Sequence, residues 1–280
     1  MIDLHTHSTA SDGSFSPSAL IAEAAKRGLS AIALTDHDTT GGLNDAAQSA
    51  KEKGMRFIPG IEFEIAWNRD GEFHLLGLGL GGQKDEFTRV MEELRRRRED
   101  RNLEIVDRMN KAGIEVSYSE ISNQIAGHSI GRPHFAAFMA EKKIVKNCKQ
   151  AFSRYLGKGK PFYIRKVGLE FDLALKIIHE SDGIAVLAHP MSLYTAWGKL
   201  PELIKSLKEK GLDGIEAWHP SAKVASCKRL EELGRKLGLY ITAGSDFHGE
   251  ARKDRKLGFT AGGRKISETF LEEIPALGAT

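Results

Sequence analysis

Two histidines separated by a single residue lie near the start of the chain, in the segment DLHTHSTASDG at residues 3–13. Side chains two positions apart on a strand point to the same side, so His5 and His7 would direct both imidazoles at one site. Asp12 adds a carboxylate shortly after them. Imidazole and carboxylate groups without thiolates are typical ligands of manganese, iron and zinc. The segment therefore predicts a site for divalent transition metals.

Similar groups recur at or just beyond the carboxyl ends of other apolar runs that are predicted to be strands. Together with the first segment they make a set of six histidines and three carboxylates: His5, His7, Asp12, His37, Glu62, His74, His189, Asp246 and His248. Side chains at the carboxyl ends of parallel barrel strands converge on one face. Since one ion takes about four to six ligands, these nine groups predict two or three ions with positions left for water and substrate.

The elements that would hold these residues alternate between apolar strands and amphipathic helices. The first helix has Ser16 as its N-cap, Pro17 at its first position and Gly28 after its last turn, which are ordinary start and stop signals. Strands alternating with helices predict parallel βαβ units, and the number of strands favours a barrel over an open sheet. Helices are expected over residues 17–27, 43–53, 169–180, 200–210 and 221–237.

Residues 84–166 interrupt this alternation. A long charged helix to about Lys111, several short helices and the loop GKGKPFYI are expected there. We expect these residues to form a helical insertion, or cap, between two parts of a barrel at residues 1–83 and 167–280, since insertions of this kind commonly cover a site at strand ends. Residues 91–166 hold 17 Lys and Arg against 9 Asp and Glu, which suits an anionic substrate or simply makes a solvated helix surface.

Composition limits the class of protein. A chain of 280 residues with 41% hydrophobic and 28% charged residues can bury a core, so a folded globular protein is expected. No apolar run approaches the roughly 20 residues that span a bilayer, and no targeting leader is recognisable, so a cytoplasmic location without a membrane partner is expected. Cys148 and Cys227 predict neither a disulfide framework nor a zinc knuckle. The sequence indicates no protein partner and no oligomeric state.

Seven motifs in order resemble those of the PHP family, the polymerase and histidinol phosphatase metallophosphoesterases of the amidohydrolase superfamily: DLHTHSTASDGSFSP, ALTDHDT, PGIEFE, FHLLGLGL, GRPHFA, LAHP and GSDFHG. The resemblance implies a distorted (β/α)7 barrel of the TIM type, with a helical insertion and a site for three ions. It also implies three ligand groups, namely His5, His7, Glu62 and Asp246; then Glu62, His74 and His189; then Asp12, His37 and His248.

Within that family, HSTASDG and GRPH are most similar to the branch that acts on 3′,5′-bisphosphonucleotides, AMP-like substrates and the 5′ ends of short RNAs. The resemblance implies a metal-dependent phosphatase in which Asp246 is catalytic as well as a ligand. Arg132 would contact phosphate, and His134 would donate to phosphate or to the leaving oxygen. Lys158 and Lys160 would reach a second phosphate, and His219 would touch substrate.

Other interpretations of these residues stay open. Arg132 is alternatively a surface ion-pair partner, His134 a helix N-terminal residue, and the two lysines ordinary loop residues. Asp36 and Asp38 are expected to orient ligands or cap the backbone, and His128 and His179 are expected to be structural. Alternative functions are a histidinol or sugar phosphatase, an amidohydrolase or deaminase, and a non-catalytic structural PHP module. Metal content, phosphate release and ammonia release distinguish these functions.

Overall fold

A computed structural model describes residues 1–82, 84–122 and 130–278 of the chain. The chain divides into two compact units, of which the first comprises Met1–Arg89 and Gly168–Thr280 and the second Val90–Val167. Within the described ranges, no helix combines the length and apolar character needed to cross a membrane.

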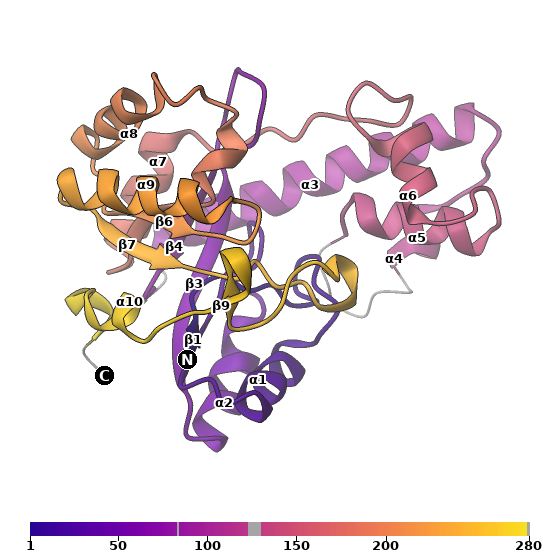
Figure 1. Cartoon of the computed structure of the whole chain (residues 1–280). Coiled ribbons are helices and arrows are strands. Elements are labelled where there is room, and N and C mark those ends of the chain that lie inside the picture. The colour runs from indigo at the N-terminus through magenta and orange to yellow at the C-terminus, as the bar shows by residue number, and fades with distance from the viewer. Residues whose placement is uncertain (83, 123–129, 279–280) are drawn as a thin grey trace. The chain divides into compact units, whose positions relative to one another are not determined.

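The first unit is built on a seven-stranded sheet in which neighbouring strands follow chain order (Figure 1). Its strands are β1 (Ile2–Asp3), β2 (Ala31–Leu34), β3 (Arg56–Glu64), β4 (His74–Leu78), β5 (Ile184–Leu187), β6 (Gly214–Trp218) and β7 (Tyr240–Ala243). The chain beyond β1 meets the chain beyond β7, where Thr6 pairs in parallel with Phe247 and the His7 N–H donates to the Phe247 carbonyl at 2.9 Å. The sheet is therefore a nearly closed barrel, which confirms the predicted fold class.

Strand β4 departs from the predicted parallel order, because it pairs antiparallel with both β3 and β5. The chain returns from β3 through a short connection instead of a crossover helix, and a short connection produces an antiparallel pair. The expectation that His74 lies at or just beyond the carboxyl end of a strand is therefore wrong, since His74 begins β4 and pairs with Glu64 at the end of β3. The reversed direction still brings His74 to the edge where the parallel strands end.

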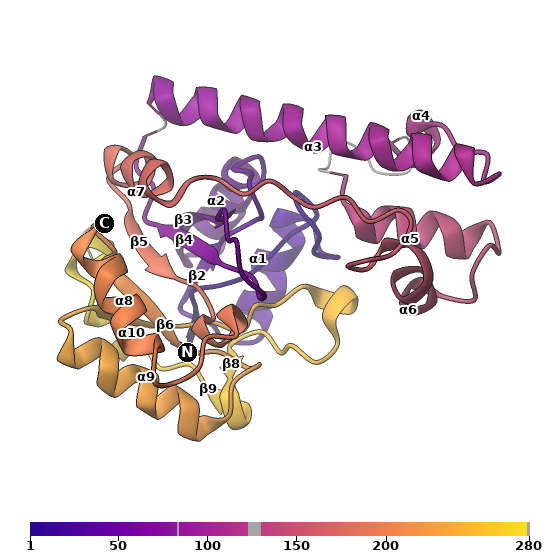
Figure 2. The ribbon, with the colours of Figure 1, turned by 90° about the horizontal axis from the view of Figure 1, so that it is seen from above.

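Helices lie around the strands of this unit when it is seen from above (Figure 2). The larger ones are α1 (Pro17–Lys26), α2 (Leu43–Glu52), α7 (Phe171–Glu180), α8 (Leu200–Glu209) and α9 (Val224–Lys236), and they confirm the five predicted helices. Ser16 caps α1 as predicted, because its hydroxyl accepts a hydrogen bond from the Ala19 N–H at 3.2 Å. A two-stranded ribbon of β8 (Phe259–Thr260) and β9 (Arg264–Lys265) and the short α10 (Thr269–Glu272) follow.

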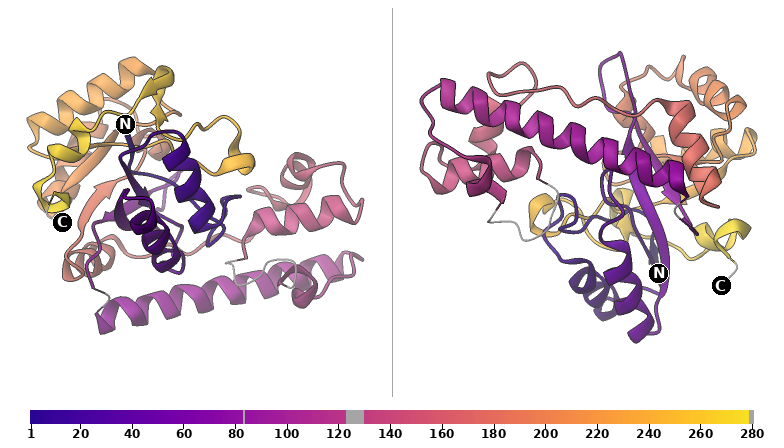
Figure 3. Two further views of the ribbon diagram at one scale, coloured as in Figure 1. Left: turned by 90° about the horizontal axis from the view of Figure 1, so that it is seen from below. Right: turned by 180° about the vertical axis from the view of Figure 1, so that it is seen from behind.

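The second unit is helical, as predicted for this part of the chain (Figure 3). It contains most of α3 (Asp85–Lys111), then α4 (Tyr118–Ser122), α5 (Arg132–Glu141), α6 (Cys148–Ala151) and a π-helical turn at Phe152–Leu156. Ile105 and Met109 of α3 pack with Phe135, Phe138 and Met139 of α5 in one buried cluster. The unit therefore has an apolar core of its own.

Candidate metal centre

All nine predicted metal-binding groups meet at one edge of the barrel. They come from the chain just beyond β1, β2, β5 and β7, from within β3 and from the start of β4. Seven of them are buried, whereas Asp12 and His37 are partly exposed. A buried cluster of ionisable groups needs compensating partners, and its two less buried members mark the side on which solvent approaches.

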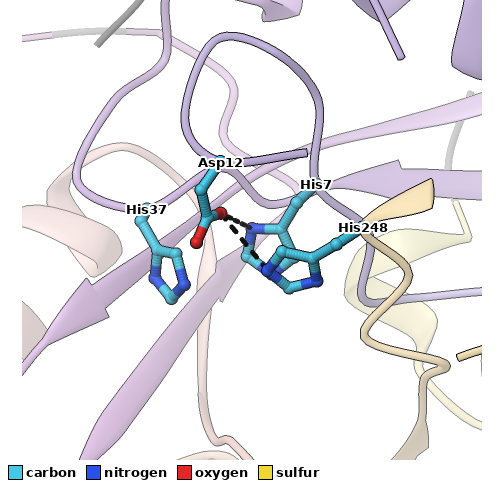
Figure 4. Close-up of side chains that lie close together, drawn as sticks. All are labelled: His7, Asp12, His37 and His248. Atoms are coloured by element: carbon cyan, nitrogen blue, oxygen red, sulfur yellow. Dashed lines mark ion pairs between the residues drawn. The ribbon is translucent and has the colours of Figure 1, made fainter. Parts of the chain in front are cut away.

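The nine groups, together with His219, form overlapping sets whose ligand atoms lie within 4.8 Å of one another. Figure 4 shows one set, in which Asp12 Oδ1 lies 3.2 Å from His248 Nε2 and 4.0 Å from His7 Nδ1, with His37 alongside. The sets are His7, Asp12, His37 and His248; His5, Glu62 and His189; His37, Glu62 and His74; and His5, His219 and Asp246. Shared members join the four sets into one continuous cluster of candidate metal ligands.

The Glu62 carboxylate lies at the middle of the cluster. Its Oε1 lies 2.9 Å from His74 Nδ1 and 3.0 Å from His189 Nε2, and its Oε2 lies 3.3 Å from Nε2 of both His5 and His7. Among the described residues, neither Glu62 Oε2 nor His7 Nδ1 has a hydrogen-bond partner, although both atoms are buried. Buried polar atoms nearly always have partners. Cations among these atoms would satisfy them, so the site fits divalent metal ions.

Charge is balanced inside the cluster. Burial raises the pKa of Glu62, but the imidazoles of His37, His5 and His74 outweigh burial and hold that pKa well below its usual range. Burial lowers the pKa of His7, but Asp246 and Glu62 raise it to about 10. Without metal, His7 is therefore an imidazolium beside two carboxylates, and a metal ion must displace its proton to bind.

Backbone strain is concentrated at the same edge. His189 and Asp246 adopt φ angles of 26° and 53°, which side chains other than glycine rarely adopt. The Asp246 N–H donates to the His5 carbonyl at 2.9 Å, and the His189 N–H donates to Glu216 Oε2 at 2.7 Å. Such strain persists where surrounding contacts hold it, and it clusters at functional sites.

Glu216 is a residue of this site that the sequence reasoning missed. It is buried in β6, and His5 Nδ1 donates to its Oε1 at 3.0 Å. This contact places a proton on Nδ1 of His5. The other ring nitrogen, Nε2, faces Glu62 and lies 3.3 Å from its Oε2. A carboxylate behind a ligating imidazole fixes its tautomer and orientation. The available signal was an acidic residue within the apolar run GIEAW, since buried carboxylates need partners.

His219 follows β6 and lies inside the cluster. Its Nε2 lies 3.3 Å from Asp246 Oδ2, and its side chain is 4% exposed. Its Nδ1 accepts a hydrogen bond from the Ser221 N–H at 3.2 Å. Burial lowers the pKa of His219, so the ring is neutral and its Nε2 faces Asp246.

Four of the predicted substrate-binding residues belong to the second unit. Arg132 begins α5, and its guanidinium lies 5.2 Å from the centre of the Tyr163 ring. His134 lies in the same helical turn, and its Nδ1 accepts a hydrogen bond from the Gly131 N–H at 2.9 Å. Its neutral ring therefore carries a proton on Nε2. Lys158 and Lys160 are exposed in the loop after the π-helical turn.

The carboxylate of Asp36 supports the loop that carries Asp12. It accepts hydrogen bonds from the Ser8 N–H and hydroxyl at 2.8 and 2.6 Å. Asp38 instead accepts one from the Glu64 N–H at 3.1 Å. These contacts agree with the orienting and capping roles expected of both aspartates.

Of the two histidines expected to be structural, one forms an ion pair with an aspartate outside the cluster. His179 Nε2 lies 2.7 Å from Asp213 Oδ2. His128 lies outside the described residues.

Comparisons with known proteins place the chain among phosphoesterases. Residues 3–171 match the family model described as PHP domain. The chain is 36% identical to a 5′-3′ exoribonuclease of Haemophilus influenzae over 88% of this chain and 89% of that protein. It is 31% identical to a 3′,5′-nucleoside bisphosphate phosphatase of Chromobacterium violaceum, covering 98% and 96%. A solved structure described as a metal-dependent phosphoesterase from Bifidobacterium adolescentis matches at 25% identity, with a TM-score of 0.86 and coverage of 100% and 96%.

Proposed function

Because this chain belongs to the PHP family of metal-dependent phosphoesterases, we propose that it hydrolyses phosphate esters of nucleotides. The favoured substrates are 3′,5′-bisphosphonucleotides, from which it releases phosphate, followed by AMP and the 5′ ends of short RNAs. The names of the Chromobacterium and Haemophilus relatives support this choice of substrates. The observation that carries the proposal is the set of overlapping imidazole and carboxylate groups around Glu62.

The ligand groups implied by the family resemblance are proposed to hold two or three ions of manganese, iron or zinc. Bound ions would supply positive charge that stabilises phosphoryl oxygens and activates water for attack on phosphorus. Asp246 is proposed to act in catalysis from within this set, and its ionised form is supported by its surroundings. Burial raises the pKa of Asp246, but the imidazoles of His219 and His7 hold it well below the usual range. His219 is proposed to contact substrate beside it.

Residues 84–166 are proposed to act as a cap that contributes further substrate contacts, on the strength of the GRPH motif and the basic charge of this segment. Arg132 would bind phosphoryl oxygens through its planar fork of donors. His134 would donate its Nε2 proton to the leaving ribose oxygen. Lys158 and Lys160 would bind the phosphate that is not cleaved. A cytoplasmic location completes the proposal, since nucleotides and RNA are found there.

The test is phosphate release by purified, metal-supplemented protein from adenosine 3′,5′-bisphosphate, AMP, histidinol phosphate and a short 5′-phosphorylated RNA. We expect the bisphosphate to give the highest kcat/KM and chelation to abolish turnover. A Glu62→Gln variant should lose both bound metal and activity. The matched control Glu52→Gln alters an exposed glutamate on α2 and should lose neither.

Some outcomes would replace the proposal. Faster release from histidinol phosphate would favour the histidinol phosphatase function, and release of ammonia instead of phosphate would indicate deaminase chemistry. Metal binding without any phosphate release from all four substrates would indicate a structural module.

A further inference from the structure

Arg255 is a buried cation beside the metal centre to which the proposed function gives no role. The residue is 8% exposed, although arginine is rarely buried without partners. Its Nε lies 3.7 Å from Asp246 Oδ2 and 3.5 Å from Asp254 Oδ2. Within the described part of the chain, this Nε has no hydrogen-bond partner.

Two carboxylates form ion pairs with the guanidinium, but within the described residues neither accepts a hydrogen bond from its Nε. Asp246 already faces imidazoles on both oxygens, with Oδ1 3.3 Å from His7 Nε2 and Oδ2 3.3 Å from His219 Nε2. The side chain of Asp254 is 66% exposed and is solvated by water. A guanidinium stays charged and carries five N–H donors, so leaving its buried Nε without an acceptor is unfavourable. The position calls for an anion that enters the site.

The chain around Arg255 is held firmly in place. The Gly258 N–H donates to Asp3 Oδ2 at 2.7 Å, and Asp3 Oδ1 accepts from the Ser245 N–H at 2.9 Å. Asp3 itself is completely buried at the end of β1. The Arg255 N–H donates to the Arg252 carbonyl at 3.0 Å. The guanidinium is therefore carried by a segment tied to the barrel, as a binding group must be to act without reorganisation.

We propose that Arg255 binds the phosphoryl group that is being cleaved. Its closest charged neighbour within the centre is Asp246, a proposed metal ligand, so a phosphoryl group at the metals would lie within reach of the guanidinium. Arginine and phosphate pair through two parallel charged hydrogen bonds. This inference rests on the proposed function and divides the phosphate contacts. Arg255 would bind the reacting phosphoryl group beside Arg132, and Lys158 and Lys160 would bind the other phosphate.

The test measures the binding of inorganic phosphate to metal-loaded protein by calorimetry, together with metal content and the thermal unfolding midpoint. Arg255→Met should keep the metal content and weaken phosphate binding by about tenfold to a hundredfold, as expected when a charged hydrogen-bonding partner is lost. Arg252→Met is the matched control, because it removes a cation three residues away whose side chain is 44% exposed. That control should leave phosphate binding within about twofold of the wild type, because an exposed charge is screened by solvent.

A second variant covers the case in which Arg255→Met does not fold. Arg255→Lys keeps a buried charge but lacks the planar guanidinium, so its phosphate affinity should fall between those of the wild type and Arg255→Met. The inference is overturned if either folded variant binds phosphate as the wild type does. It is also overturned if Arg255→Met loses metal while its loaded fraction binds phosphate normally, because the arginine would then serve only to orient Asp246.

Failure of the proposed function gives a different pattern. Wild-type protein that binds phosphate but hydrolyses no nucleotide refutes the nucleotide substrates. A weakened phosphate affinity in Arg255→Met under those conditions still supports the anion-binding role.

Discussion

At the scale of single residues, the site consists of groups whose roles depend on partners far away in the sequence. His5 meets Glu216 across 211 positions, and no local spacing connects them. The nine candidate ligands were predictable because imidazole and carboxylate types recur at strand ends. Glu216 and Arg255 were not predictable, because the role of an isolated acid or arginine depends on the atoms that surround it in the folded chain.

Glu216 provides the first prediction. Glu216→Gln keeps the size of the side chain but removes the negative charge behind His5. The affinity for the metal ion that His5 is proposed to hold should therefore fall by about tenfold to a hundredfold. Competition with a chelating dye measures this affinity. Nitrogen chemical shifts of His5 should show a smaller fraction protonated at Nδ1, a signature that general destabilisation does not produce.

The control for this variant is Glu209→Gln, which alters a side chain that is 65% exposed at the end of α8. Its metal affinity should match that of the wild type. An unchanged His5 tautomer in Glu216→Gln would contradict the orienting role of Glu216.

At the scale of elements, the five larger helices of the barrel unit followed from periodicity and capping signals, and the structure confirms them. The direction of β4 could not be predicted from these signals, because the alternation of apolar residues is the same in either direction along a strand. The distance between successive strands was the usable signal, since the stretch between β3 and β4 is too short for a crossover helix.

The start of α5 provides the second prediction. The Gly131 N–H donates a hydrogen bond to His134 Nδ1, so the proton of the neutral ring is on Nε2, the atom proposed to donate it to the leaving oxygen. His134→Gln should lower kcat for AMP by about a hundredfold or more, as is typical for loss of a general acid. A p-nitrophenyl phosphate ester should be much less affected, because its leaving group needs no proton. Equal losses on both esters would show that His134 is not the donor.

At the scale of the whole molecule, the helical unit concentrates positive charge, whereas the barrel carries the candidate metal ligands. The proposed role of Lys158 and Lys160 predicts a preference for substrates with two phosphates. Adenosine 3′,5′-bisphosphate should exceed AMP in kcat/KM by about ten- to a hundredfold, the effect of one added charged contact.

Replacing both Lys158 and Lys160 by alanine should reduce that preference and leave the AMP reaction nearly unchanged. Lys142→Ala and Lys149→Ala, which remove exposed lysines elsewhere in the same unit, provide the control. A ratio of kcat/KM values that stays the same in the double variant would refute this role for the two lysines.

The balance of protons in the centre provides the fourth prediction. The pKa of His7 is raised to about 10 in the metal-free protein, so this ring is protonated at neutral pH and must lose its proton to bind metal. Metal affinity should therefore rise with pH up to about 10 and fall as the solution becomes more acidic. Calorimetry in buffers of different ionisation enthalpy should detect release of at least one proton per protein. Release of none near pH 7 would contradict the proton balance.

The pairing of Thr6 with Phe247 joins the beginning of the barrel to its last strand, and ligands lie on both sides of that join. His5 and His7 precede Asp246 and His248 in the chain, so they are synthesised well before them. A growing chain thus carries His5 and His7 without the carboxylate and imidazole proposed to complete their groups until residues 246 and 248 have been added. Full loading with metal should therefore wait for these later residues, and fragments truncated before residue 246 would bind metal incompletely.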